Sequence, residues 1–166
     1  GGKEVASSSK TSEKKEKLEI LLGRKVSGSI EILLEFEGRL EDGLSGFYRS
    51  VYRNKGKTCY MATTHFEPAD ARRAFPCFDR PDMKATFDIS IAARKGMKAI
   101  SNMPVKAERA EGNRKIFEFE RTPRMSTYLV YLGIGDFEFI EGKAEGVSIR
   151  VATVPGKSGQ GKFAMD

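Results

Sequence analysis

Histidine, cysteine and tryptophan are scarce in this sequence, which holds one histidine, two cysteines and no tryptophan. With His65 alone, the two- and three-histidine metal sites of proteins cannot be built from this chain. Cys59 and Cys77 are too few for a disulfide framework, so we expect two reduced thiols, with a Cys59–Cys77 disulfide as the alternative. We therefore expect no metal bound by these residues and a reducing, cytoplasmic location.

Long apolar runs are also missing. None approaches the roughly 20 residues of a membrane-spanning helix, and no apolar segment of the secretory type follows the N-terminus. A phosphate-binding loop is absent too, because the run from Pro155 to Ser158 lacks the first glycine at the needed spacing. These absences argue against a membrane partner and against a nucleotide site of that kind.

The charge is basic, with 29 lysines and arginines against 23 acidic residues and a formal net charge of +6. A basic protein raises nucleic acid as a partner, yet the excess is spread along the chain and no nucleic-acid-binding motif accompanies it. We expect a mixed, solvated surface and no nucleic-acid partner. The alternative, a nucleic-acid-binding β-domain, predicts binding that weakens with salt.

Alternating apolar and polar residues, separated by turn signals, predict an all-β domain of short antiparallel strands. The only helical signals are short, at Pro68–Ala74 and after Lys162. We divide the chain into a flexible tail or interstrand loop (1–17), a β-domain (18–156) and the start of a linker (157–166). The predicted strands are Leu18–Leu22, Ile30–Glu37, Phe47–Tyr52, Thr58–Thr64, Ala85–Ile91, Met97–Asn102, Val105–Ala110, Arg114–Glu120, Thr127–Ile134 and Val147–Val154.

One stretch, Thr63–Pro81, interrupts the strand pattern with prolines, phenylalanines, charges and the single histidine. Irregular backbone presented by a rigid scaffold is where functional residues concentrate. His65 and Glu67 are two residues apart, so in a strand both point to the same side and could bind a substrate ammonium. The alternatives are a loop that packs its own phenylalanines, and a local ion pair of Glu67 with Arg72 or Arg73.

The same stretch, reading T-H-F-E-P, then D-A-R-R and F-P-C-F-D-R-P, closely resembles the signature of the M1 family of zinc aminopeptidases. Further matches follow the family order over roughly residues 18–166. They are the G-F-Y-R-S strand at Gly46–Ser50, the S-N-M-P turn at Ser101–Pro104, and T-P-R-M-S-T-Y-L followed by G-D-F at Gly135–Phe137. Within the family, the sequence looks most similar to archaeal members that act on peptides released by the tricorn protease and the proteasome.

The resemblance implies the N-terminal domain of such an enzyme, a saddle-like antiparallel β-sandwich, here lacking its first strands. It implies that Glu67 holds the free α-amino group of a peptide and that His65 replaces a glutamine contacting the first side-chain pocket. By the same resemblance Arg72, Arg73, Cys77, Asp79 and Pro81 shape the loop.

The family's zinc belongs to a catalytic domain whose H-E-x-x-H and G-A-M-E-N segments this sequence lacks. We therefore expect the chain to be inactive alone and to act with the parent's own catalytic domain on peptides with a free N-terminus. The alternative function is a non-catalytic M1-like interaction scaffold.

Overall fold

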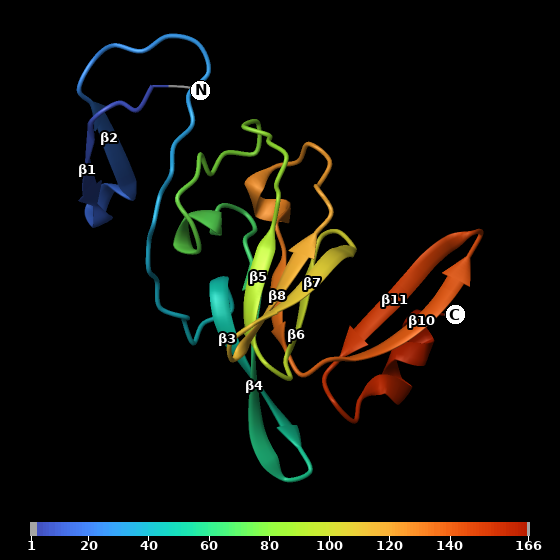
Figure 1. Cartoon of the computed structure of the whole chain (residues 1–166). Coiled ribbons are helices and arrows are strands. Elements are labelled where there is room, and N and C mark those ends of the chain that lie inside the picture. Colours follow the sequence, from blue (N-terminus) through green and yellow to red (C-terminus); the bar gives the residue numbers. More distant parts are fainter. Residues whose placement is uncertain (1–2, 166) are drawn as a thin grey trace. The chain divides into compact units, whose positions relative to one another are not determined.

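The computed structural model describes residues 3–165 and divides the chain into two units, Gly1–Gly38 and Arg39–Asp166. Strands are the main regular secondary structure of both units, and every paired ladder is antiparallel (Figure 1). The prediction of an all-β, antiparallel fold is confirmed. The strands are β1 (Ser7–Ser12), β2 (Lys17–Leu22), β3 (Gly46–Asn54), β4 (Lys57–His65), β5 (Ser90–Arg94), β6 (Lys98–Ser101), β7 (Val105–Glu111), β8 (Arg114–Phe119), β9 (Leu132–Gly135), β10 (Glu138–Ala144) and β11 (Val147–Thr153).

Two sheets of the second unit form a sandwich. One contains β3, β4, β9 and β6 in that order, and the other contains β5, β8 and β7. Apolar side chains from both sheets meet between them: Ile91 and Phe117 come from the three-stranded sheet, while Ala99, Leu132 and Ile134 come from the four-stranded sheet. Burial of this shared apolar surface holds the two layers together.

The turn residues explain the two clearest hairpins. Between β3 and β4, Lys55 and Gly56 both have positive φ, and Glu145 and Gly146 do so between β10 and β11. Two consecutive positive φ angles define the turn whose twist matches that of paired strands. The asparagine and glycine of Asn54–Lys57, residues typical of turns, thus form the tight turn between β3 and β4.

Glycine also permits a close approach of the paired strands β4 and β9. A Cβ atom on Gly135 would lie 2.8 Å from the Cβ atom of Met61, and one on Gly133 would lie 2.9 Å from the hydroxyl of Tyr131. Both distances are shorter than side chains tolerate. The close approach of β9 to Met61 of β4 therefore depends on the absence of a side chain at Gly135, whereas the neighbour of Gly133 is the flexible end of the Tyr131 side chain.

The first unit differs from the sequence prediction. Residues 1–17 were expected to form a flexible tail or interstrand loop, but Ser7–Ser12 form β1, which pairs along its whole length with β2. The expectation of a flexible segment followed from its lack of apolar side chains to bury. The polar strand β1 is instead held by backbone hydrogen bonds to β2. The division between the two units falls at 38/39, within the range 18–156 expected for the β-domain. Gly1 and Gly2, at the start of the predicted tail, lie outside the described residues.

Three predicted strands are absent or shortened. Residues 30–37 form no strand, because their alternating pattern has no paired neighbour in the structure. The strand expected from Ala85 begins only at Ser90, since the hydroxyl of Thr122 takes the backbone N–H of Phe87. The strand expected over Thr127–Ile134 is a 3-10 turn, η3 (Thr127–Leu129), followed by β9.

At the C-terminal end, residues 157–166 were expected to start a linker. Instead η4 (Ser158–Ala164) packs on the β10–β11 hairpin, where Gly161 lies against Ile140 and Val151. Asp166 lies outside the described residues. Within residues 3–165, no helix combines the length and the apolar composition that a membrane crossing requires.

Candidate functional site

His65 is the last residue of β4, and Glu67 follows two residues later. Burial alternates along this stretch: Thr64 and Phe66 are buried, whereas His65 and Glu67 are exposed. This period-two pattern continues the strand by one step beyond its last paired residue. The structure therefore brings the two predicted site residues to the outward side of the same chain segment.

Phe66 anchors the segment between these two polar residues. Its side chain is only 2% exposed, and it packs in a cluster with Ala71, Met125 and Val130. The ring of Phe75 meets it edge to face, with ring centroids 6.0 Å apart and an interplanar angle of 76°. Such a pair contributes about 0.5–1.5 kcal/mol beyond the area that it buries. Phe66 thus fixes the backbone from which Glu67 projects.

Asp79 ties the rest of the stretch into place. Its carboxylate accepts hydrogen bonds from the backbone N–H of Arg72 at 3.1 Å, from Nε of Arg72 at 3.0 Å, and from the hydroxyl of Thr127 at 2.9 Å. The buried carboxylate therefore joins η2 (Ala71–Arg73) to η3. These contacts agree with the scaffold role that the resemblance implies for Arg72 and Asp79.

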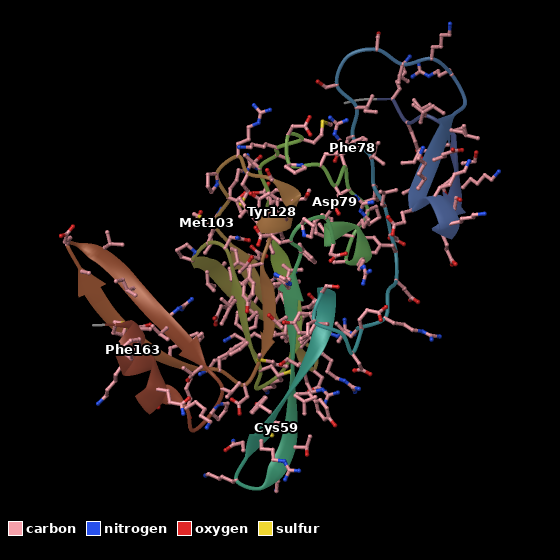
Figure 2. The ribbon with its side chains drawn as sticks, turned by 180° about the vertical axis from the view of Figure 1, so that it is seen from behind. Cys59, Phe78, Asp79, Met103, Tyr128 and Phe163 are labelled. Carbon is pink, nitrogen blue, oxygen red and sulfur yellow. The ribbon has the colours of Figure 1, made fainter. Side chains whose placement is uncertain are left out.

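A second connection comes from the S-N-M-P turn. The side chain of Asn102 donates to the carbonyl of Leu129 at 2.6 Å and accepts from the backbone N–H of Tyr131 at 2.7 Å. Figure 2 shows Met103, Tyr128, Phe78 and Asp79 at the same end of the second unit, far from Cys59 on the β3–β4 hairpin. Three stretches with family motifs therefore meet at one end of the sandwich.

The Glu67 carboxylate has no bonded partner among residues 3–165. The ion pair that the sequence offered as an alternative does not form, since Arg72 binds Asp79 and Arg73 pairs with Asp70 at 3.0 Å. Within residues 3–165, no hydrogen bond or ion pair engages the Glu67 side chain. An exposed, unpaired carboxylate can accept charge-assisted hydrogen bonds from an ammonium group.

One of the two ring nitrogens of His65 makes a hydrogen bond to the backbone. Its Nδ1 lies 3.2 Å from the carbonyl oxygen of Leu44. A carbonyl only accepts hydrogen bonds, so Nδ1 carries the proton in this contact and Nε2 is the acceptor of the neutral ring. His65 therefore offers Nε2 to a ligand.

Cys77 contributes no nucleophile to the central stretch at neutral pH. Both cysteines are free thiols, so the Cys59–Cys77 disulfide is absent. Burial raises the pKa of the Cys77 thiol to about 11, with a further contribution from nearby Asp79 that Arg72 opposes. Because the thiolate is the reactive form, Cys77 is unreactive at neutral pH.

Two cavities lie away from His65 and Glu67. The larger one is lined by residues of β6, β7, β8, β10 and β11, including Lys98, Phe139 and Arg150. The sequence analysis missed these residues, because no motif links positions so far apart in the chain. Only the docking of the β10–β11 hairpin beside β6 brings them together.

Comparison with known proteins agrees with the motifs. The sequence profile of the Peptidase M1 N-terminal domain matches residues 2–129. Aminopeptidase M1-D of Oryza sativa subsp. japonica is 48% identical over 136 residues, covering 81% of this chain and 16% of that protein. Probable aminopeptidase 2 of Sulfurisphaera tokodaii is 49% identical over 143 residues, covering 86% and 18%.

A yeast relative gives the same result. Aminopeptidase 2, mitochondrial, of Saccharomyces cerevisiae is 43% identical over 141 residues, which cover 84% of this chain and 15% of that protein. The chain thus spans less than a fifth of the length of the curated relatives that it matches. The β-sandwich, the hydrogen-bonded loop around Asp79 and these matches lead to one conclusion: the chain belongs to the family of M1 peptidase N-terminal domains.

Proposed function

We propose that this chain is the substrate-anchoring part of a zinc aminopeptidase. In this role Glu67 binds the free α-amino group of a peptide, and His65 lines the pocket for the first side chain. The observation that carries the proposal is the state of Glu67: its carboxylate is exposed and unpaired, while Phe66 beside it is fully packed. A side chain that positions a substrate needs a fixed backbone, which Phe66 provides, and a free hydrogen-bond acceptor, which Glu67 provides.

A fixed carboxylate explains why such an enzyme removes residues from the end of a chain. The α-amino group of a peptide is a cation at neutral pH, whereas an internal peptide bond carries no charge. Binding that cation at Glu67 sets the distance from the N-terminus to the bond that is cleaved. A peptide whose terminus is blocked loses the charge-assisted contact.

His65 would tune which first residue is accepted. In its neutral form Nε2 can accept a hydrogen bond, and in the protonated form it donates one. The family's glutamine offers both a donor and an acceptor in one side chain. We therefore expect His65 to change the preference for the first side chain relative to a glutamine at this position.

The zinc of such an enzyme does not fit this chain. Among residues 3–165, no three histidine, cysteine, aspartate or glutamate side chains lie together in a way that could hold a metal ion. We assign the zinc to a catalytic domain outside this sequence, which would be the partner of this domain. The 166-residue chain is accordingly proposed to be inactive alone, acting on peptides in a reducing cytoplasm without a nucleic-acid or membrane partner.

Substitution of Glu67 in the full-length parent enzyme tests the proposal. Glu67→Gln should lower kcat/KM for an aminoacyl anilide by about tenfold or more, as expected from the loss of a charge-assisted hydrogen bond. Glu141→Gln, at an exposed position of β10, serves as the matched control and should leave kcat/KM unchanged. An unchanged kcat/KM for Glu67→Gln would refute the anchor role.

The alternative function, a non-catalytic interaction domain, has one observation in its favour. Phe78, within the central stretch, is 77% exposed, and Met83 and Leu129 are also exposed. Exposed apolar side chains of this kind often mark protein contacts. The two functions are distinguished by the rest of the parent sequence, since only a catalytic parent contains H-E-x-x-H.

A further inference from the structure

A cavity of about 370 Å³ lies where the C-terminal hairpin meets the sandwich. Strands β6, β7 and β8 line it on the side of the sandwich, and β10 and β11 line it on the side of the hairpin. This volume is at the lower end of the range for small-molecule sites in proteins. The cavity is therefore large enough for a small ligand or for one group of a larger one.

Three cations and two aromatic rings are among the ten residues that line this cavity. Arg150 and Lys98 both lie over the ring of Phe139, with Cζ of Arg150 at 4.5 Å and Nζ of Lys98 at 5.0 Å from its centroid. Nζ of Lys115 lies 5.0 Å from the centroid of Phe117. Each cation of the wall thus rests on a phenylalanine, which orients it without neutralising its charge.

The charges of this wall do not balance. Glu108 is the one carboxylate among the residues lining the cavity, and it is already paired with Lys115. Lys98 donates to the backbone carbonyl of Phe137. In the part of the chain that the structure describes, neither Lys98 nor Arg150 has a carboxylate partner. Two positive charges therefore share one phenylalanine ring at the edge of a cavity, and an anion placed there would relieve their repulsion.

We propose that this cavity binds the oxyanion of a small ligand, a phosphate or a carboxylate. The guanidinium of Arg150 supplies paired N–H donors that match either group. Lys98 adds a second positive charge at the same wall of the cavity. The site is independent of Glu67, which binds a cation, and it requires no catalytic domain.

Titration of the 166-residue chain tests the site. Inorganic phosphate and benzoate are added in separate series at constant ionic strength, because exposed lysines attract any anion at low salt. Amide resonances are followed by two-dimensional NMR. We expect saturable shifts at Lys98, Phe117 and Arg150 with at least one probe, and no such shifts with chloride. Saturation by phosphate alone identifies a phosphate site, and saturation by benzoate alone identifies a carboxylate site.

Matched variants distinguish specific binding in the cavity from nonspecific attraction of anions to a basic surface. Arg150→Gln and Lys98→Gln should each weaken binding by about tenfold, the effect of losing one charge-assisted hydrogen bond. Lys143→Gln removes a charge from the same hairpin at a position that does not line the cavity, and it should leave affinity unchanged. The spectra also show whether each variant is folded. Absence of saturation with both probes, or equal weakening by Lys143→Gln, would overturn the proposal.

Discussion

Two irregular regions of this chain have similar residues, but one of them has buried side chains, whereas the side chains of the other are exposed to solvent. The central loop, residues 66–84, and the exposed segment, residues 24–38, both lack strands and both carry phenylalanine and charge. In the central loop Phe66 is 2% exposed and Asp79 accepts three hydrogen bonds. In the exposed segment Leu33 is 88% exposed and Phe36 is 54% exposed.

The difference lies in partners rather than in composition. The central loop has a buried carboxylate that accepts hydrogen bonds from Arg72 of the same loop and from Thr127 of another segment. It also has an aromatic pair, Phe66 and Phe75, in one cluster with Ala71. The exposed segment alternates apolar and acidic residues, but no strand pairs with it in the structure. An irregular region can thus be buried where its polar groups find hydrogen-bond partners, because backbone groups without partners resist burial.

The largest effect should come from removing the aromatic anchor. Phe66→Ala deletes a buried ring and should lower the free energy of unfolding by about 3–5 kcal/mol. The same change in the exposed segment, Phe36→Ala, should cost no more than about 0.5 kcal/mol, since most of its ring already contacts water. Urea denaturation followed by circular dichroism measures both. Equal losses would mean that the exposed segment is packed in solution.

Replacing the buried carboxylate of Asp79 should lower the free energy of unfolding by a smaller amount. Asp79→Asn removes the charge that Arg72 faces and leaves an amide that cannot accept all three donors. We expect a loss of about 2–3 kcal/mol, because buried donors are left without a partner. The control is Asp88→Asn, whose ion pair with Arg121 is largely exposed and should contribute about 0–1 kcal/mol. If both variants unfold at the same urea concentration, Asp79 does not hold the loop together.

The smallest effect concerns the thiol of the central loop. The pKa of Cys77 is raised to about 11 in the folded chain, above the roughly 8.5 of an unfolded thiol. The resulting stabilisation is complete below about pH 8.5 and is lost as the pH rises towards about 11. The stability difference between the wild type and Cys77→Ala should therefore shrink from pH 8 to pH 10. Cys59→Ala serves as the reference for general alkaline weakening, and a difference that grows with pH would contradict the assignment.

Local patterns predicted the parts of this fold that local chemistry decides. The β3–β4 hairpin follows from the turn at Asn54–Lys57, and β7 and β8 follow from alternation around Gly112. The pattern at residues 30–37 is equally regular, yet a strand also needs a neighbour, which a pattern cannot supply. Thr127 fails as a strand residue because its hydroxyl bonds to Asp79, 48 residues earlier in the chain.

The site was predictable only in part, and for the same reason. His65 and Glu67 are close in sequence, so a motif could draw attention to both. The free state of Glu67 was not predictable, because it depends on where Arg72 and Arg73 find their carboxylates. The cationic cavity was out of reach, since Lys98 and Arg150 meet only after the hairpin docks.

One side chain at this end of the sandwich has a consequence for the ageing of the protein. Asn102 replaces a peptide group, with its amide nitrogen donating to Leu129 and its amide oxygen accepting from Tyr131. Spontaneous loss of ammonia from Asn102 would leave an aspartate, which has no donor at neutral pH and would face the Leu129 carbonyl with a negative charge. Deamidation at this one position would therefore loosen the chain next to the central loop. Stored samples would show it first as an acidic species with faster amide exchange around Tyr131.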